Sequence, residues 1–240
     1  MRPIPARRYL LLDDNLAFTE NLAEILRDQG HEVTVTVSGP EALKAITSEK
    51  FDAVLTDMRM PTMSGAQFVR ELRQIDPGIP AIVATAYSGD DDLQVARNEG
   101  LLAIVGKPLP LTRLLALLRT ARRNGLVALI EDDEALSDNL SEALRLHGLT
   151  VVSAKSILEV ARFGAVRPFA ALVDLRVPGG AAGEAMSVLA TRYPGIPMFV
   201  ITGHDDAPPL TPVAIFRKPF ATSTLLQELE RLYASNASTV

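Results

Sequence analysis

Acidic, hydroxyl and amino side chains follow successive apolar runs in the first half of the chain, where the strands of a sheet would end. In chain order they are Asp13 with Asp14, then Asp57, Thr85 and Lys107. In an α/β fold, ligands and reactive groups collect at the carboxyl ends of the strands. An aspartate at that edge, beside further carboxylates and an ammonium group, is a candidate nucleophile or metal ligand.

The second half of the chain repeats this order of residue types. The matching residues again end apolar runs and are Glu131 with Asp132, Asp174, Thr202 and Lys218. Corresponding residues lie 118 apart at the acidic pair, 117 apart at the central aspartate and at the threonine, and 111 apart at the lysine. A long, nearly constant offset indicates duplicated domains rather than the short period of a solenoid. We therefore predict two domains, residues 1–124 and 125–240.

The chemistry of each set points to phosphoryl transfer. Carboxylates held close together repel, and they favour a divalent cation between them. Oxygen ligands without histidine or cysteine suit Mg²⁺ or Mn²⁺. A carboxylate beside such a metal can attack a phosphoryl group to give an aspartyl phosphate. A lysine and a threonine hydroxyl would then neutralise and bind the phosphoryl oxygens.

Each position taken alone has an ordinary structural explanation. An acidic pair before a helix is most often an N-cap, and we expect capping here in addition to any chemistry. A Lys-Pro pair after a strand is most often a turn. These explanations do not account for four such positions in one order, twice in one chain.

The hydrophobic periodicity predicts how these residues are positioned. It predicts strands near 8–12, 32–36, 52–56, 80–84 and 102–105, and helices near 15–29, 39–48, 64–74, 90–99 and 110–123, with Asn124-Gly125 as the stop of the last helix. Five strands that alternate with five helices indicate an α/β fold, with a doubly wound parallel sheet and helices on both faces.

One helix should be missing from the second half. Between Thr202 and Lys218 the chain is six residues shorter than between Thr85 and Lys107, and it contains Pro208, Pro209 and Pro212. Proline removes a backbone donor and clashes with the preceding helical turn. We predict that helix four is absent or vestigial there.

Composition excludes several classes of protein. The 240 residues contain no cysteine and three histidines, which argues against a disulfide scaffold or a zinc site. The net charge of −5 gives no basic footprint for direct nucleic-acid binding. No apolar run reaches the roughly 18–20 residues of a membrane span. These features predict a cytoplasmic protein that binds neither nucleic acid nor membrane.

The segment Asp57-Met58-Arg59-Met60-Pro61-Thr62-Met63-Ser64-Gly65, with Ala84-Thr85-Ala86 and Lys107-Pro108, resembles the signatures of response-regulator receiver domains of bacterial two-component signalling. The resemblance extends over nearly the whole chain as two tandem receivers. It implies two flavodoxin-like, five-stranded sheets of strand order 2-1-3-4-5, and a cis bond before Pro108.

The resemblance also implies a role for each residue. The phosphoacceptors are Asp57 and Asp174, and the switch and phosphate-binding residues are Thr85, Lys107, Thr202 and Lys218. The metal ligands are Asp13, Asp14, Asp57 and the backbone carbonyl of Arg59 in the first domain, and Glu131, Asp132, Asp174 and the backbone carbonyl of Arg176 in the second. Asp133 is an alternative to Asp132.

The chain departs from the family pattern at two kinds of position. The loop after Asp174 places its glycine one residue later than usual, at Gly183. The family often has an aromatic residue three positions before the lysine, and this chain has Ile104 and Ile215 there. An aromatic switch is therefore not expected in either domain.

The sequence favours a phosphoacceptor switch, rather than a metabolic enzyme, that accepts phosphoryl groups from a histidine kinase or phosphotransfer protein. Output would pass through a downstream protein partner, and a homodimer through the first domain is one form that this could take. An alternative is a non-phosphorylated adaptor, above all for the second domain. A Mg²⁺-dependent phosphohydrolase is disfavoured because Arg59 and Arg176 stand where such enzymes usually carry a second acid.

Overall fold

The structure is a computed structural model, and it describes residues 6–86 and 91–237. Backbone proximity divides the chain into two compact units. The first unit contains residues 1–124 and 164–166, and the second contains residues 125–163 and 167–240. Within the described residues, no helix combines the length and the apolar character needed to cross a lipid bilayer.

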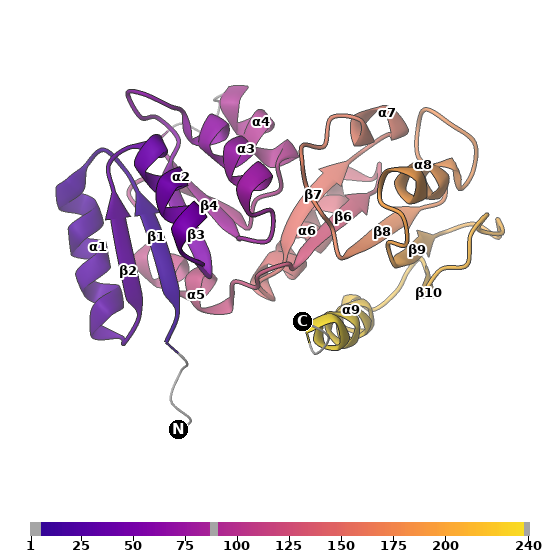
Figure 1. Cartoon of the computed structure of the whole chain (residues 1–240). Coiled ribbons are helices and arrows are strands. Elements are labelled where there is room, and N and C mark those ends of the chain that lie inside the picture. Colours follow the sequence, from indigo (N-terminus) through magenta and orange to yellow (C-terminus); the bar gives the residue numbers. More distant parts are fainter. Residues whose placement is uncertain (1–5, 87–90, 238–240) are drawn as a thin grey trace. The chain divides into compact units, whose positions relative to one another are not determined.

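The first unit alternates five strands with five helices (Figure 1). The strands are β1 (Arg8–Leu12), β2 (Glu32–Thr36), β3 (Ala53–Asp57), β4 (Ala81–Thr85) and β5 (Ala103–Gly106). The helices are α1 (Leu16–Asp28), α2 (Gly39–Ser48), α3 (Gly65–Ile75), α4 (Asp91–Asn98) and α5 (Leu111–Thr120). All strand pairs are parallel, in the order β2-β1-β3-β4-β5. The predicted fold is therefore confirmed.

Strand alternation divides the core of the first unit between the two faces of its sheet. Leu10, Val54 and Val83 join a cluster with residues of α2, α3 and α4. Their strand neighbours Leu11 and Leu55 join a second cluster with residues of α1 and α5. Successive side chains of a strand point to opposite faces, so a strand with helices on both sides is apolar throughout.

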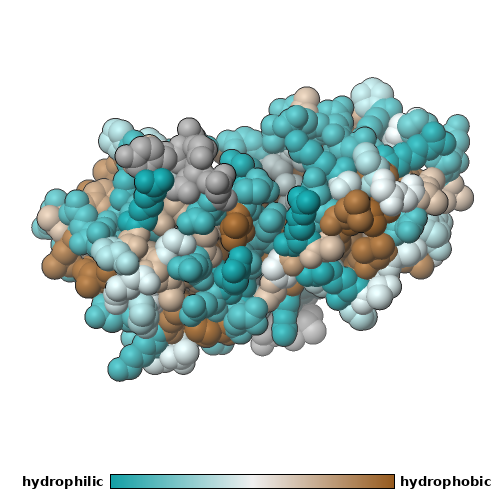
Figure 2. Space-filling view, turned by 90° about the horizontal axis from the view of Figure 1, so that it is seen from above, coloured by the Kyte–Doolittle hydropathy of each residue, from teal (hydrophilic) through white to brown (hydrophobic). Residues whose placement is uncertain are grey.

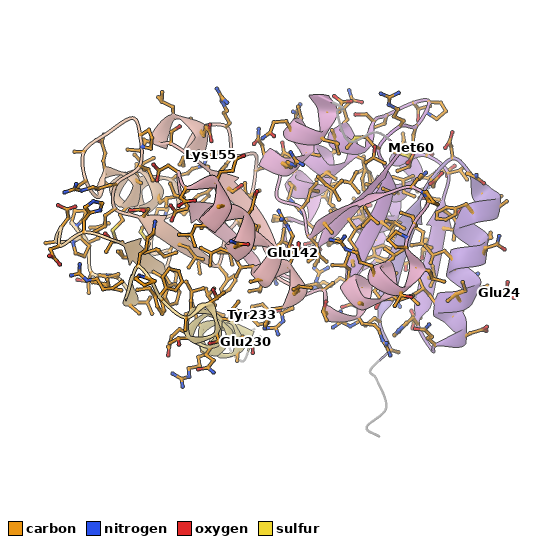
Figure 3. The ribbon with its side chains drawn as sticks, turned by 180° about the vertical axis from the view of Figure 1, so that it is seen from behind. Glu24, Met60, Glu142, Lys155, Glu230 and Tyr233 are labelled. Carbon is orange, nitrogen blue, oxygen red and sulfur yellow. The ribbon has the colours of Figure 1, made fainter. Side chains whose placement is uncertain are left out.

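The second unit repeats the sheet with fewer helices. Its strands are β6 (Leu126–Ile130), β7 (Thr150–Ala154), β8 (Ala170–Asp174), β9 (Met198–Thr202) and β10 (Ala214–Arg217), paired in parallel in the order β10-β9-β8-β6-β7. Its helices are α6 (Glu134–Leu146), α7 (Ile157–Val160), α8 (Glu184–Arg192) and α9 (Thr222–Ala237). In α9, Tyr233, which Figure 3 labels, meets the Phe169 ring edge-on at 5.5 Å between centroids.

The predicted loss of helix four is confirmed. Residues 203–213, all of them described, contain no helix between β9 and β10. A second shortening was not predicted. Helix α7 has four residues, whereas α2 at the corresponding place in the first unit has ten. After Val160 the chain turns at Ala161 and Arg162 and then buries Phe163.

The predicted end of the last helix of the first unit is wrong. Helix α5 stops at Thr120, before the expected Asn124-Gly125 stop. Asn124 adopts a positive φ of 56° in the connection itself, and its N–H donates to the Gly78 carbonyl at 2.8 Å. Arg123 forms an ion pair with Asp76 at 2.6 Å instead of lying in the last helical turn. Tertiary contacts therefore determine where this helix ends.

A buried histidine should make the first unit pH-sensitive. His31 is 5% exposed, accepts the N–H of Arg7 at Nδ1 (3.3 Å), and meets the Tyr9 ring edge-on. Burial lowers the pKa of His31, and the charges of Arg7 and Arg119 lower this pKa further. Folding therefore favours the neutral ring. The contribution of His31 to the free energy of unfolding should have its full value above the ordinary pKa of about 6.5. It should fall as the pH drops through the folded-state pKa.

This expectation can be checked by urea unfolding of the whole chain at neutral pH and at about pH 5. The midpoint should fall on acidification in the wild type and fall less in His31→Asn, which keeps an acceptor for the Arg7 N–H. An equal fall in both proteins would show that other groups cause the sensitivity.

Candidate functional site

Three carboxylates converge at the carboxyl edge of the first sheet. Asp13 and Asp14 follow β1, and Asp57 is the last residue of the neighbouring strand β3. Each offers a carboxylate oxygen, and these oxygens lie within 4.8 Å of one another. Asp13 and Asp57 are buried, whereas Asp14 is exposed. The cluster therefore opens to solvent on the side of Asp14.

Lys107 joins this cluster from the end of β5. Its ammonium group lies 2.7 Å from Asp13 and 2.8 Å from Asp57. Burial lowers the pKa of Lys107, but hydrogen bonds to Asp13 and Asp57 outweigh it and hold the pKa above its ordinary value. The second carboxylate oxygen of Asp57 accepts the backbone N–H of Arg59 at 3.2 Å. One oxygen of Asp57 is thus oriented by the lysine and the other by the backbone.

The second unit builds the same arrangement from its own residues. Glu131, Asp132 and Asp174 bring carboxylate oxygens within 4.8 Å of one another. The Lys218 ammonium lies 2.9 Å from Glu131 and 2.6 Å from Asp174. The other oxygen of Asp174 accepts the Arg176 N–H at 2.9 Å. Both halves of the chain therefore converge on one geometry.

Glu131 is the more constrained acid of the second cluster. It is fully buried, which raises its pKa, although the Lys218 ammonium opposes that rise. Lys218 lies 2.9 Å from both of its oxygens, but only Oε1 is hydrogen-bonded. A buried carboxylate oxygen without a hydrogen bond is costly. A cation among these three acids would supply the missing partner.

Divalent cations fit the donor set of both clusters. Each cluster offers two buried carboxylates and one exposed carboxylate, with one ammonium group against three acids. Hard oxygen donors without nitrogen or sulfur suit Mg²⁺. In the second unit, Asp132 and Arg176 also line one cavity of about 480 Å³ at the same edge.

Thr85 and Thr202 end the strands beside the acceptors. Both are buried, and the carbonyl of each accepts the N–H of the lysine that follows the next strand, at 2.7 and 2.9 Å. The Thr202 hydroxyl accepts the His204 N–H at 3.1 Å and donates to the His204 carbonyl at 3.3 Å. In the second unit the hydroxyl is thus bonded to its own loop. The peptide bonds before Pro108 and Pro219 are cis, and the first of these was predicted.

The expectation that the acidic pairs cap the next helices is wrong in both units, because the cap is the residue after each pair. Asn15 caps α1, and its side chain accepts the Phe18 N–H. In the second unit Asp133 caps α6 and accepts the Leu136 N–H at 3.0 Å. Because the carboxylate of Asp133 serves the helix, Asp132 is the residue that joins the acidic cluster.

The loop after each acceptor closes on a glycine. The Gly65 N–H donates to the Met58 carbonyl at 2.8 Å, and the Gly183 N–H donates to the Leu175 carbonyl at 2.7 Å. The extra residue of the second loop is accommodated because Gly183 takes a left-handed conformation with a φ of 79°. The displaced glycine therefore preserves the closure of the loop.

Gly65→Ala should destabilise the first unit. A Cβ at this position would lie 2.4 Å from the Asp57 carbonyl oxygen and 2.9 Å from the Met58 Cα, and backbone atoms cannot move aside cheaply. We expect a loss of about 1–3 kcal/mol in the free energy of unfolding, measured with urea. Gly106→Ala is the matched control, because a Cβ there meets no atom within 4 Å. Equal losses in both variants would contradict this account of the loop.

Sequence reasoning missed one ion pair at the second site. The Arg176 guanidinium binds both carboxylate oxygens of Asp206, at 2.6 and 3.2 Å. Asp206 lies in the segment that replaces helix four, so the residue two positions after Asp174 is tied to that segment. No local pattern indicates such a pair, because its partners are 30 residues apart.

Comparison with known proteins identifies the family of this chain. A family model described as the response regulator receiver domain matches residues 9–119. A response regulator receiver protein of Anaeromyxobacter sp. (strain Fw109-5) is 55% identical over 234 residues, which cover 98% of this chain and 98% of that protein. The chain belongs to the response regulator receiver family. The resemblance to response regulator receivers is therefore confirmed, and the family model itself matches only the first half of the chain.

Receivers are phosphoacceptor switches that typically bind Mg²⁺ at an acidic site and interact with histidine kinases or phosphotransfer proteins. The transcriptional regulatory protein GlrR of Escherichia coli (strain K12) is 34% identical over 100 residues, which are 42% of this chain and 22% of GlrR. The matched segment of this receiver protein thus covers less than a quarter of GlrR.

Solved receiver structures also match. A CheY-like receiver domain protein from Methanospirillum hungatei JF-1 has 29% identity and a TM-score of 0.45, covering 46% of this chain and 89% of that one. The receiver domain of the sensor histidine kinase PA1611 from Pseudomonas aeruginosa PAO1 has 26% identity and a TM-score of 0.44, covering 48% and 96%. Its structure has a magnesium ion coordinated in the active-site cleft.

Proposed function

We propose that the chain is a response regulator with two receiver domains, residues 1–124 and 125–240, that accept phosphoryl groups on Asp57 and Asp174. The observation that carries this proposal is the ammonium group held within 2.6–2.9 Å of the acceptor carboxylate and of a buried acid in each unit. A duplicated geometry of this kind supports a duplicated activity.

Each acceptor is oriented for attack on phosphorus. Lys107 or Lys218 holds one carboxylate oxygen, and the N–H of Arg59 or Arg176 holds the other. One carboxylate oxygen forms the new bond to phosphorus while the bond from phosphorus to the donor nitrogen or oxygen breaks. The donor leaves with that electron pair. The lysine and the hydroxyl of Thr85 or Thr202 then hold the phosphoryl oxygens.

Mg²⁺ would be held by Asp13, Asp14, Asp57 and the Arg59 carbonyl in the first domain, and by Glu131, Asp132, Asp174 and the Arg176 carbonyl in the second. Bound there, the ion would neutralise charge on the phosphoryl oxygens. Mn²⁺ has similar ligand preferences and should substitute for it.

The donor is a histidine kinase or a phosphotransfer protein, and the output is a change in binding to a downstream protein. The only catalysis is self-phosphorylation and self-dephosphorylation, in the cytoplasm and without direct binding of nucleic acid or membrane. Bonds of the phosphoryl group to the threonine and lysine would favour one of two surface states. A homodimer through the first domain is one form of this output.

The second candidate is an adaptor whose second domain does not accept phosphate. One observation favours it for that domain. The Thr202 hydroxyl already donates to the His204 carbonyl, so donation to a phosphoryl oxygen must break that bond. The acidic cluster and Lys218 favour phosphorylation instead, because an interaction surface has no need of them.

Beryllofluoride with Mg²⁺, which mimics a bound phosphoryl group, separates the two candidates. We expect amide shifts at the carboxyl ends of the strands in both units, reaching Thr85 and Thr202, and none with Mg²⁺ absent. A response only near Asp57 would make the second domain an adaptor. No response in either unit would overturn the proposal.

A further inference from the structure

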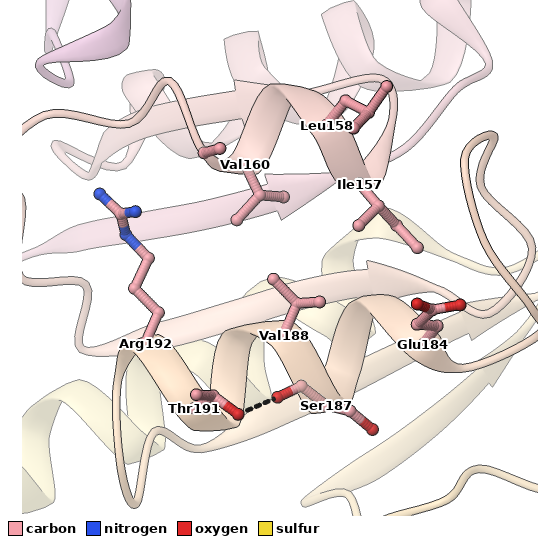
Figure 4. Close-up of a pocket in the computed structure, with 9 residues that line it drawn as sticks. Ile157, Leu158, Val160, Glu184, Ser187, Val188, Thr191 and Arg192 are labelled. Atoms are coloured by element: carbon pink, nitrogen blue, oxygen red, sulfur yellow. Dashed lines mark hydrogen bonds between the residues drawn. The ribbon is translucent and has the colours of Figure 1, made fainter.

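A groove with a volume of about 580 Å³ lies between α7 and α8 of the second unit (Figure 4). Ile157 and Val160 from α7 point toward Val188 from α8, whereas Leu158 points away from α8. The remaining lining includes polar residues of α8, namely Glu184, Ser187, Thr191 and Arg192. Leu158 is 74% exposed. The face shown in Figure 2 is largely hydrophilic, and one of its apolar patches lies over the second unit. Contiguous exposed apolar surface commonly marks an interaction site.

The first unit serves as an internal control for this surface. Helices α3 and α8 end 117 residues apart, the same offset as between the two acceptors. At that offset, Val188 corresponds to Glu71. The N-caps of α2 and α7, Ser38 and Ser156, lie 118 apart like the two acidic pairs, so Leu158 corresponds to Pro40. The first unit thus carries an acid where the second carries Val188, and its α2 continues for ten residues where α7 has four. The apolar groove is therefore a property of the second unit, not of the shared fold.

Opposite charges lie at the two ends of the groove. Glu184 and Arg192 are exposed and stand four residues before and four residues after Val188 on α8. Residues at this spacing share one helix face, and eight residues span about 12 Å. The two charges are therefore symmetric about Val188 and have opposite signs.

Both charged side chains are held in place. The Glu184 carboxylate accepts the Ala181 N–H at 2.8 Å. The Arg192 guanidinium donates to the Phe163 carbonyl at 2.6 Å and to the Tyr193 hydroxyl at 2.9 Å. Side chains that are already ordered lose less conformational entropy when a partner binds.

We propose that this groove is a self-association surface of the chain, separate from a dimer through the first domain, and that its occupant is the same groove of a second copy. In a two-fold interface, residue i of one copy contacts residue j of the other, and j contacts i. An antiparallel pair of α8 helices with the axis at Val188 places each Glu184 against Arg192 of the second copy. The exposed Leu158 of each copy then enters the apolar groove of the other. A single charge pattern satisfies both copies, which an unrelated partner would not require.

Sedimentation equilibrium of the whole chain tests this proposal. We expect a dimer of the 25.9 kDa chain without phosphodonor or Mg²⁺. Leu158→Glu should weaken dimerisation at least about tenfold. Val188→Glu is a second variant at the same surface, and it restores the residue type that the first unit carries at the corresponding position, Glu71. Leu146→Glu is the matched control, because Leu146 is also a mostly exposed leucine of the second unit but lies on α6.

A charge exchange distinguishes a second copy from any other occupant. Glu184→Arg and Arg192→Glu should each weaken the dimer about tenfold, and the double variant should restore it, because each new arginine meets a new glutamate. Circular dichroism checks that every variant is folded. The proposal is overturned if the wild type is monomeric at all concentrations, if Leu146→Glu matches Leu158→Glu, or if the double variant stays monomeric. None of these outcomes bears on phosphoryl transfer to Asp57 or Asp174.

Discussion

Asp57→Asn is expected to remove one of two phosphoryl groups that the chain gains from a small phosphodonor with Mg²⁺. Asp174→Asn should remove the other, and the double variant should gain none. An amide oxygen is a far weaker nucleophile than a carboxylate, while its size and shape preserve the packing around it. Intact-mass spectrometry counts the phosphoryl groups directly.

Asp52→Asn is the matched control for this experiment. Asp52 lies just before β3, at the opposite end of the strand from Asp57, and accepts the Arg8 N–H at 2.8 Å. Its variant should gain two phosphoryl groups like the wild type. Full uptake by the double variant would place the acceptors elsewhere and end the phosphoacceptor account.

Arg73→Met is expected to cause the largest loss of stability in the first unit. Arg73 is 2% exposed, and its guanidinium donates to the carbonyls of Glu99, Gly100 and Ile79, each at 2.7 Å. Burial lowers its pKa to about 10, so the group stays charged at neutral pH. Methionine fills much of the volume but leaves three buried carbonyls without these donors. Each unmet group costs about 1–3 kcal/mol, which predicts a total loss of at least about 3 kcal/mol.

Urea unfolding of the whole chain measures this loss, and Arg27→Met provides the comparison. Arg27 and its partner Glu20 are both about half exposed in an ion pair of 3.2 Å. Pairs of this kind contribute about 0–1 kcal/mol. If the two arginine variants lose equal free energy of unfolding, the hydrogen bonds of Arg73 to the carbonyls do not account for the stability of this region.

Much of the site could be predicted because it depends on local patterns. The apolar runs that end at Asp57 and Asp174 are strands, and the carboxyl ends of parallel strands share one edge. The ends of β3 and β4 were predicted one residue early, so that Asp57 and Thr85 close their strands instead of following them. This error does not move the side chains to another edge. The loss of helix four was also predictable, since the prolines lie inside the affected segment.

Other features could not be predicted because they depend on partners far away in the chain. Arg73 lies on α3, whereas the Glu99 and Gly100 carbonyls it binds follow α4. At the offset of 117, the second unit has Ala190 in the place of Arg73, and it has no helix before β10. Among the described residues, a buried guanidinium is thus present only in the unit whose carbonyls after helix four can accept its hydrogen bonds. Neither segment reveals this by itself.

The sequence alone determined the order in which the chemical groups follow successive strands, their duplication and the class of ion that they suit. Residue types and periodicity carry that information. Only the tertiary structure decided that Asn15 caps α1, that Asp206 binds Arg176, and that α7 is short enough to open a groove beside α8. These features depend on which surfaces meet after folding. The free energy of such contacts is set by packing and distance in space, and no spacing along the chain encodes it.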